Sequence, residues 1–400
     1  YGAIQGAYWM YFGAIMSFAS VFLLGKNYTN SEIGVILAAA SILAVFLQPL
    51  LADAADKSQK ASLMCITGII VIGLLIATIT LYIFPTKSLI LSIIFILLGA
   101  WLTSLQPIIN SMAFYLSRSG YVINFGVTRS GGSVAYAVLC LILGSLVADY
   151  GIKTIPAIGM GILILLLLSL LATDKLYKRA ISSNAIDSNI KKVTQGSETI
   201  SLKAFITRNK IFLVFTIGIV LVFFQNSVLN TYLMQIITAV GGNSSQMGQL
   251  FFFMALLELP GLFFFSQIRK RFSCQFLLKV ASVAFVFKVF LTYMAPSVGF
   301  IYLAFLFQLI SFPIFLSASV YLVDEVMEKG EAVKGQSFIT GMITLSNVFA
   351  SLMGGVILDL SGASLLLMIS TILAVMGTGI VILTVGRIKP KDNLFKHNVS

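Results

Sequence analysis

The sequence predicts an all-α membrane protein with twelve transmembrane helices in two six-helix bundles. Hydrophobic residues make up 58% of its 400 residues and charged residues only 10%, whereas a soluble domain carries roughly 25% charged residues. The mean hydropathy is +1.01. The apolar runs show no two-residue alternation, so they predict helices rather than the strands of a membrane barrel.

Twelve apolar runs, separated by turn signals, are each long enough to cross a bilayer as a helix. Several exceed the roughly 20 residues that a crossing needs, and these helices are expected to tilt. The predicted spans are 5–25, 31–52, 61–84, 88–116, 130–150, 154–173, 210–239, 247–267, 275–295, 298–323, 337–359 and 362–386.

One long polar stretch divides these spans six and six. Residues 174–209 are rich in Ser, Asn, Lys and Thr, a composition typical of a linker. The sequence therefore predicts three parts: an N-terminal bundle at 1–173, a cytoplasmic linker at 174–209, and a C-terminal bundle with a tail at 210–400.

The two halves also repeat each other in sequence. Pro49 precedes the first short basic loop of the first half, and Pro260 precedes its counterpart 211 positions later. Asp149 and Asp359 close similar apolar runs 210 positions apart, and a glycine follows each within three residues. Such repeats predict two pseudo-symmetric bundles with parallel topology.

The basic residues predict which side of the membrane each loop occupies. If both termini and the 174–209 linker lie inside, the outer loops hold only Lys26, Lys87 and Lys153, and nearly all other basic residues fall inside. This positive-inside bias predicts a multi-pass protein of the cell membrane with cytoplasmic termini. It also accounts for the net charge of +12, so no nucleic-acid partner is expected.

Two charged residues, Glu258 and Lys288, lie deep inside predicted spans, whereas the other charged residues of the spans lie near span ends. Glu258 is eleven residues into the run 247–267, about 16 Å deep in a hydrocarbon core roughly 30 Å thick. Lys288 lies at a depth that differs by roughly 6 Å, within reach of a lysine side chain. Because buried ionisable groups usually mark transport paths, we interpret the pair as a proton-coupling site. A static ion pair that only fixes helix packing is the alternative.

Arg129 and several amides form the predicted substrate site. A guanidinium suits carboxylates and vicinal hydroxyls, although an interfacial arginine that reaches lipid head groups is the alternative for Arg129. Amides both donate and accept hydrogen bonds, which fits sugars or nucleosides, but they also hold membrane helices together. The candidate amides are Gln106, Asn110, Gln225, Asn226, Asn230, Gln308 and Asn347.

Two stretches carry a resemblance to a known family: residues 30–57 (NSEIGVILAAASILAVFLQPLLADAADK) and the run Phe125-Gly126-Val127-Thr128-Arg129. They resemble the lactose permease-like branch of the major facilitator superfamily. The first is similar to the second span and following loop of its oligosaccharide–proton symporters, and the second is similar to their fifth span. The resemblance extends more weakly from span two to span eleven and includes phenylpropionate- and nucleoside-type permeases. It implies the major facilitator fold, with alternating access to a midplane site between the bundles.

The resemblance implies roles for four residues. Arg129 matches the arginine that binds sugar hydroxyls, and Tyr136 stands where the sugar permeases have a stacking tryptophan. Glu258 matches their eighth-span glutamate, and Lys288 stands at a ninth-span arginine that helps the proton to leave.

The chain departs from that family elsewhere. Gln308 and Ser311 replace the coupling histidine and the proton-carrying glutamate of span ten, and Phe305 replaces a lysine. Lactose and that proton route are therefore not carried over, and Gln308 and Ser311 are kept as candidate substrate-binding residues. Asp56 and Lys57 are a remnant of the superfamily's loop motif and predict a gating role; an ordinary solvated loop is the alternative.

Together these observations predict a secondary transporter of a small polar solute, with sugar or oligosaccharide favoured and a proton coupled through Glu258. A nucleoside or aromatic-acid permease, a multidrug efflux carrier and a receptor that binds without turnover are the alternatives. The sequence has no metal-ligand cluster, nucleophile–base constellation or phosphate-binding loop, so neither an enzyme nor a cofactor is expected. The expected partners are the solute, a proton and membrane lipid, and the protein is expected to be a monomer.

Overall fold

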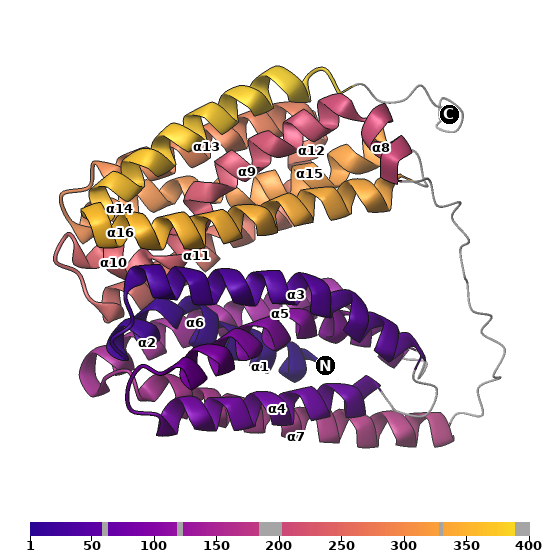
Figure 1. Ribbon diagram of the computed structural model, residues 1–400. Coiled ribbons are helices and arrows are strands. Elements are labelled where there is room, and N and C mark those ends of the chain that lie inside the picture. Colours follow the sequence, from indigo (N-terminus) through magenta and orange to yellow (C-terminus); the bar gives the residue numbers. More distant parts are fainter. Residues whose placement is uncertain (58–62, 118–122, 184–201, 328–330, 389–400) are drawn as a thin grey trace. The chain divides into compact units, whose positions relative to one another are not determined.

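The computed structural model describes residues 1–57, 63–117, 123–183, 202–327 and 331–388; the side chains of 52–57, 181–183 and 202–204 are outside this description. The described residues form helices and no strand (Figure 1). The first half contains α1 (Gly2–Phe12), η1 (Gly13–Ser17), α2 (Ala19–Gly25), α3 (Asn30–Lys57), α4 (Leu63–Ile83), α5 (Leu89–Ser117), α6 (Phe125–Tyr150) and α7 (Thr154–Ser183). The second half contains α8 (Leu202–Arg208), α9 (Lys210–Thr231), α10 (Leu233–Thr238), α11 (Ser244–Phe263), α12 (Phe265–Arg269), α13 (Cys274–Tyr293), α14 (Val298–Phe305), η2 (Leu306–Leu309), α15 (Phe312–Val326) and α16 (Ala332–Val385).

Ten helices in the described part of the chain are long and apolar enough to cross a membrane, and the bent pair Gly2–Ser17 and Ala19–Gly25 makes an eleventh. Helix α16 has 54 residues, about 81 Å at 1.5 Å per residue. That length exceeds twice the roughly 30 Å of a hydrocarbon core, and a non-helical residue, Gly362, interrupts it. Counted as two crossings, α16 brings the total to the predicted twelve, and the prediction of an all-α membrane protein is confirmed.

The glycines that close the repeated sequences have the same backbone conformation. Gly151, after α6, has φ 81° and ψ −179°, and Gly362, inside α16, has φ 76° and ψ −174°. Glycine reaches positive φ without the steric cost that a Cβ imposes. The sequence repeat therefore corresponds to a repeated turn, 211 positions apart.

Two predicted boundaries in the first half are wrong. Helix α6 begins at Phe125 rather than 130, because Oδ1 of Asn124 caps its first turn by accepting from the backbone N–H of Val127 at 3.1 Å. Helix α7 continues to Ser183 rather than ending at 173. An ion pair four residues apart, Lys178 with Asp174 at 2.6 Å, supports this extension.

Three predicted spans in the second half are broken helices. The predicted span 247–267 divides into α11 and α12 at Phe264. The predicted span 210–239 divides into α9 and α10 at Tyr232, whose φ and ψ are −115° and 23°. The predicted span 298–323 divides into α14, the 3₁₀ turn η2 and α15. Hydropathy measures apolar content along the chain, so it does not detect such breaks.

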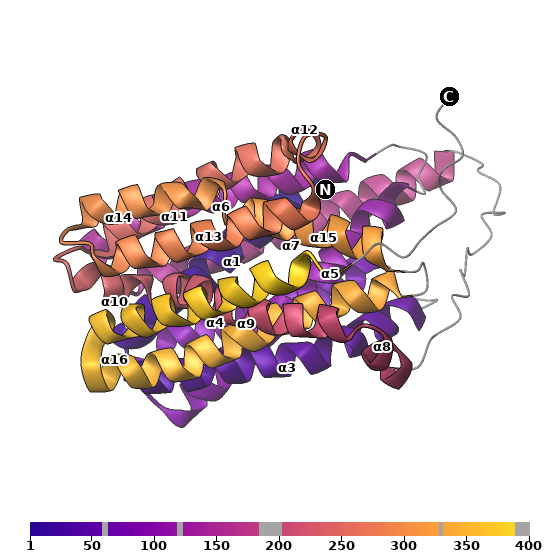
Figure 2. The ribbon, with the colours of Figure 1, turned by 90° about the horizontal axis from the view of Figure 1, so that it is seen from above.

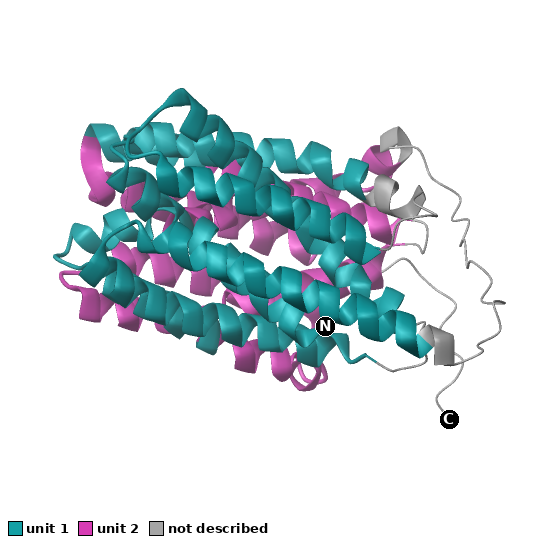
Figure 3. Cartoon of the chain, turned by 90° about the horizontal axis from the view of Figure 1, so that it is seen from below, with its two compact units in different colours: residues 1–191, 230–256, 351–360 teal, residues 192–229, 257–350, 361–400 magenta. Residues whose placement is uncertain are grey.

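The chain packs as two compact units (Figure 3). Unit 1 contains residues 1–191, 230–256 and 351–360, and unit 2 contains residues 192–229, 257–350 and 361–400. Each unit thus takes segments from more than one part of the sequence. The division into bundles at 1–173 and 210–400 with a linker at 174–209 stays a prediction.

In unit 1, glycines bring two pairs of helices close together. A Cβ on Gly34 of α3 would lie 2.1 Å from a backbone oxygen of α16, and one on Gly355 of α16 would lie 2.3 Å from a backbone oxygen of α3. In the same way, a Cβ on Gly144 of α6 would lie 2.6 Å from a backbone oxygen of α11, and one on Gly248 of α11 would lie 2.2 Å from a backbone oxygen of α6. Small residues allow this close backbone packing in membrane helices.

Asp359 ties α16 to the start of α3 in unit 1. Its Oδ1 accepts from the backbone N–H of Asn30 at 3.0 Å and from the Asn30 side chain at 2.8 Å. Its Oδ2 accepts from the backbone N–H and the hydroxyl of Ser31. Gln235 of α10 donates to Oδ1 of Asn30 at 2.9 Å. A carboxylate at a helix N-terminus satisfies amides that have no partner within the helix and complements the helix dipole.

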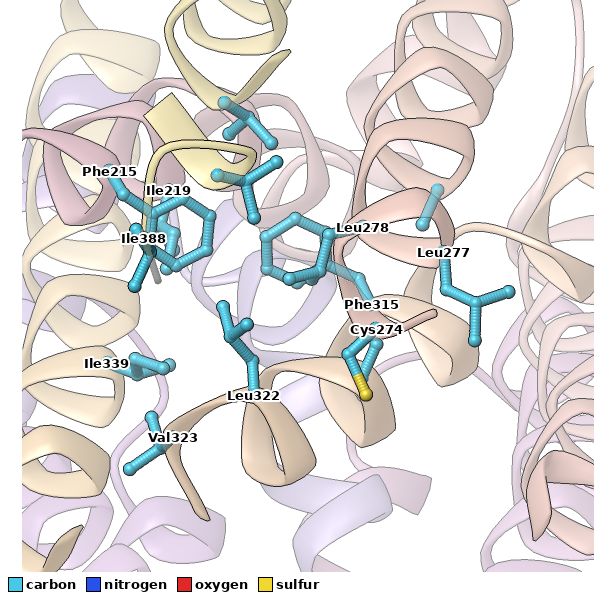
Figure 4. Close-up of a cluster of buried hydrophobic side chains, with 14 of the residues drawn as sticks. Phe215, Ile219, Cys274, Leu277, Leu278, Phe315, Leu322, Val323, Ile339 and Ile388 are labelled. Carbon is cyan, nitrogen blue, oxygen red and sulfur yellow. The ribbon is translucent and has the colours of Figure 1, made fainter. Parts of the chain in front are cut away.

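An aromatic core holds unit 2 together, and part of the surrounding apolar cluster is drawn in Figure 4. The ring of Phe223 on α9 lies 5.4 Å from that of Phe285 on α13 and 5.2 Å from that of Phe315 on α15. Helix α13 also packs against α14 (Figure 2). Phe223 and Phe285 lie three residues before Asn226 and Lys288, so the core fixes the backbone that carries these polar residues.

Candidate functional site

Four polar side chains from four elements of unit 2 form one hydrogen-bonded chain. Gln308 of η2 donates through Nε2 to Oε1 of Glu258 on α11 at 2.7 Å. Lys288 of α13 donates through Nζ to Oε1 of Gln308 at 2.7 Å and to Oδ1 of Asn226 on α9 at 3.2 Å. Glu258 and Lys288 are therefore linked through Gln308.

The break between α14 and α15 puts Gln308 in this position. The chain leaves α-helical geometry at η2, and Ser311 precedes α15 with φ −89° and ψ −84°. Gly261, three residues after Glu258, allows α11 to pack against this break, since a Cβ there would lie 3.0 Å from the oxygen of Leu309. Broken membrane helices of this kind are typical of binding sites in transporters.

Lys288 is fully buried and is surrounded by groups that accept a positive charge. Two amide oxygens accept hydrogen bonds from its Nζ, which also lies 5.5 Å from the ring centroids of both Phe285 and Phe305. An ammonium group inside a protein needs such partners because its desolvation costs several kcal/mol. Glu258 is only partly buried, so its side chain is more accessible to solvent than that of Lys288.

Two buried polar side chains beside the hydrogen-bonded chain, those of Ser311 and Gln225, lack hydrogen-bond partners among the described residues. Oγ of Ser311 and both amide atoms of Gln225 have no hydrogen-bond partner among the described residues, and both side chains are fully buried. An unsatisfied buried polar group costs about 1–3 kcal/mol, so native proteins usually supply water or a ligand there.

The other predicted amides of unit 2 are in helix–helix contacts. Asn347 of α16 accepts a hydrogen bond from the hydroxyl of Ser227 on α9, which fits the helix-packing alternative. Asn226 is part of the chain to Lys288.

In unit 1, Arg129 stacks on an aromatic ring. Its guanidinium carbon lies 3.9 Å from the ring centroid of Trp9 on α1, and its Nη1 donates to Oγ of Ser133 at 3.0 Å. Gly132 makes room for the indole, because a Cβ there would lie 2.7 Å from Trp9 Cδ1. Nε1 of Trp9 is buried without a hydrogen-bond partner among the described residues.

A second polar group of unit 1 joins α1 to α5. Gln5 donates through Nε2 to Oδ1 of Asn110 at 3.1 Å and to the hydroxyl of Tyr1 at 2.7 Å. Its Oε1 is buried without a partner in the described structure. Gln106, one turn before Asn110, is half-buried. Tyr136 of α6 shares a 2.8 Å hydrogen bond with Ser17.

Sequence reasoning missed Trp9 and Gln5. Both lie in the first predicted span, where Trp9 is one of two tryptophans in the chain and Gln5 stands among apolar residues. The rarity of tryptophan and the polarity of Gln5 could therefore have marked both residues as candidates, although an aromatic residue in a span is more often part of the apolar core.

Residues 1–368 match the MFS_1 like family. The chain belongs to this family. It is also 24% identical, over 415 residues that include all of this chain and 97% of the relative, to the "uncharacterized transporter YwbF" of Bacillus subtilis (strain 168).

Solved transporter structures have the same fold. The nucleoside transporter NupG superposes with a TM-score of 0.77 over 98% of both chains at 14% identity. An autoinhibited POT family peptide transporter superposes with a TM-score of 0.71 over 99% of this chain and 98% of its own, at 9% identity. The predicted major facilitator fold is confirmed. As an MFS_1 like member, the protein is a multi-pass membrane transporter that moves a small-molecule substrate, and it is not an enzyme.

The predicted gating pair of this MFS_1 like transporter, Asp56 and Lys57, lies in the last turn of α3. Its side chains fall outside the described residues, so the gating role stays a prediction. The substrate-binding and proton-coupling roles of the residues above likewise stay predictions.

Proposed function

We propose that the protein is a proton-coupled secondary transporter of a small neutral polar solute, and that Glu258 binds the coupled proton. Sugars and oligosaccharides are the first candidates. We also propose the orientation that the positive-inside rule favours, in the cell membrane with both termini in the cytoplasm.

The chain from Glu258 through Gln308 to Lys288 carries the proposal. A carboxylate in a membrane transporter costs several kcal/mol unless it is paired, hydrated or protonated. Here the attraction of Lys288 favours the charged form of Glu258, and loss of that attraction favours its neutral form. A conformational change that alters the link through Gln308 would therefore change how tightly Glu258 holds its proton, which is the requirement for coupling.

The polar groups without partners support a neutral polar solute. In unit 1, Trp9 Nε1 and Gln5 Oε1 are buried and unpaired among the described residues, so one donor and one acceptor are available there. Hydroxyl-rich solutes satisfy both kinds of group. Arg129 adds a planar set of donors that suits vicinal hydroxyls.

A nucleoside is the second candidate substrate. The observation that favours it is the similarity in fold to the nucleoside transporter NupG over 98% of both chains. Nucleosides also carry sugar hydroxyls and a base edge that amides can bind. A lactose permease-like branch that includes nucleoside-type permeases is consistent with either substrate.

Transport by the purified protein in proteoliposomes tests the proposal. An inward proton gradient is imposed, and the uptake of labelled sugars and nucleosides is measured against vesicles without the gradient. Gradient-driven accumulation of one solute class is expected for the wild type. The variant Glu258→Gln should lose accumulation but keep solute exchange, because the neutral amide cannot release a proton.

The control is Glu32→Gln, which removes a carboxylate from an exposed ion pair with Lys87 at 2.6 Å and should leave accumulation intact. Undiminished uphill uptake by the Glu258→Gln variant would overturn the assignment of the proton to Glu258. Absence of transport for both solute classes would overturn the substrate proposal.

A further inference from the structure

A pocket of about 380 Å³ opens at one end of unit 2. It lies where α8 ends and α9 begins, beside the last residues of α15 and the residues that follow α16. Its basic lining residues are Arg208, Lys210 and Arg387, and its apolar floor includes Phe212 and Met327. Both apolar residues belong to the buried core of the unit.

The pocket carries excess positive charge. Its lining residues include no acid. Glu331 lies nearby, fully buried, and its Oε1 is 3.7 Å from Nη1 of Arg208, so it offsets one of the three cations. Lys210 and Arg387 make no ion pair with any residue that the structure describes. Two cations are thus available to an anion.

The pocket lies at the end of a candidate membrane span. Lys210 is the first residue of the helix Lys210–Thr231, which is long and apolar enough to cross a membrane, and such a crossing would put the pocket at the level of the lipid head groups. The exposed basic residues Lys270 and Arg271 follow α12 of the same unit. By the positive-inside rule, basic span ends of this kind face the cytoplasm, where the bilayer surface carries anionic lipid.

An apolar track leads away from the pocket along α9. Ile211, Val214 and Ile217 expose 45%, 45% and 51% of their surfaces. They are spaced three residues apart, so they share one face of the helix. Ile211 also lines the pocket, and the track is therefore continuous with it.

We propose that this pocket binds the phosphate head group of an anionic phospholipid, with an acyl chain along the exposed face of α9. Arginine and lysine at a membrane surface bind phosphate oxygens through charge-assisted hydrogen bonds, and basic pockets between helices on the cytoplasmic side bind acidic lipids. The apolar track favours a lipid over a soluble phosphate. The inference stands apart from the proposed transport of a neutral solute, because it uses none of the same residues.

Lipid binding to the full chain, purified in detergent and delipidated, tests the proposal. Thermal unfolding is followed while phosphatidylglycerol, phosphatidylethanolamine, inorganic phosphate or glycerol phosphate is titrated. Phosphatidylglycerol should raise the melting temperature of the wild type at concentrations where the other three do not. In native mass spectrometry, the wild type should retain one more phosphatidylglycerol molecule than a variant that lacks the charges of Lys210 and Arg387.

The pocket variant is K210Q/R387Q, and the matched control is K270Q/R271Q, which removes the same charge from exposed residues outside the pocket. The pocket variant should bind phosphatidylglycerol at least about tenfold more weakly, because the loss of each charge-assisted contact of roughly 1.4 kcal/mol weakens binding tenfold and two such contacts are removed. The control should bind like the wild type. K210Q and R387Q alone replace the double variant if it does not fold.

Three outcomes would overturn the proposal. Equal weakening in the pocket and control variants would mean that charge alone attracts the lipid. Equal stabilisation by soluble phosphates would assign the pocket to a soluble anion. Equal stabilisation by phosphatidylethanolamine would show that anionic charge is not what the pocket recognises.

Discussion

The amide of Gln308 links Glu258 to Lys288. The amide nitrogen lies 2.7 Å from Glu258 and the amide oxygen 2.7 Å from Lys288. The amide nitrogen of Gln308 only donates and therefore suits the carboxylate, and its oxygen only accepts and therefore suits the ammonium group. A single orientation of Gln308 satisfies both neighbours, so this residue relates the charge of one to the position of the other.

Replacement of this amide should destabilise the protein. Gln308→Leu keeps similar bulk, but it leaves buried Lys288 with Asn226 as its one remaining acceptor among the described contacts. The expected cost is about 1–3 kcal/mol, measured by denaturant unfolding in detergent. Gln106→Leu is the control, because Gln106 has no hydrogen bond among those found in the described residues and should lose much less. Equal losses in the two variants would contradict a bridging role.

Removal of the lysine together with its acid should cost less than removal of the bridge. Lys288→Met/Glu258→Gln takes away both charges, and replacement of a whole buried pair is often close to neutral, whereas removal of one partner leaves an uncompensated charge. Gln308→Leu instead leaves both charges in place with fewer partners. Unfolding measurements compare this double variant with Gln308→Leu and with Lys288→Met alone. A Lys288→Met/Glu258→Gln variant less stable than Gln308→Leu would mean that packing around the lysine stem, rather than its charge, dominates.

Asp359 is expected to stabilise the start of α3. Asp359→Ala removes the acceptor for four hydrogen bonds from Asn30 and Ser31. Loss of a helix-capping carboxylate costs about 0.5–2 kcal/mol. Asp149→Ala provides the matched control, since Asp149 closes the repeated sequence of the first half and is exposed without a hydrogen bond among those found in the described residues. Thermal melting should separate the variants, and equal melting temperatures would contradict the cap.

The sequence predicted the membrane crossings well because each depends only on local apolar content. It located the broken helices less well. The break at η2, which presents Gln308, arises where α11 packs closely at Gly261, and such a tertiary contact leaves no local mark in hydropathy. The charge of Glu258 was conspicuous in an apolar run, whereas the amide that links it to Lys288 was one of seven comparable candidates.

The contact between Arg129 and Trp9 illustrates the same limit. The resemblance to sugar permeases put Tyr136 at the position of a stacking tryptophan, but the ring beside Arg129 is that of Trp9 on α1, 120 residues earlier in the chain. Tyr136 instead pairs with Ser17. Contacts between distant segments depend on how helices pack, and one sequence without that packing cannot assign them.

Alanine should have opposite effects at two helical glycines. At Gly248 a Cβ would lie 2.2 Å from the backbone oxygen of Cys140, so α6 and α11 would have to separate. At Gly161 of α7 nothing lies within 4 Å of the added carbon, and alanine should stabilise the helix by up to about 1 kcal/mol. Thermal melting of both variants tests the prediction. A Gly248→Ala variant as stable as the wild type would show that this close packing does not contribute to stability.

Trp9 should report on solute binding near Arg129. The chain has two tryptophans, and Trp101 is partly exposed on α5, so Trp101→Phe leaves Trp9 as the single indole. A solute that hydrogen-bonds to Nε1 of Trp9 or displaces the guanidinium from its ring changes the polarity around the indole, and its emission should shift on titration. Arg129→Lys in this background should weaken the response at least about tenfold, because lysine lacks the planar set of donors. If the emission of Trp9 stays constant at solute concentrations that saturate transport, the solute binds elsewhere and the substrate role of Arg129 is wrong.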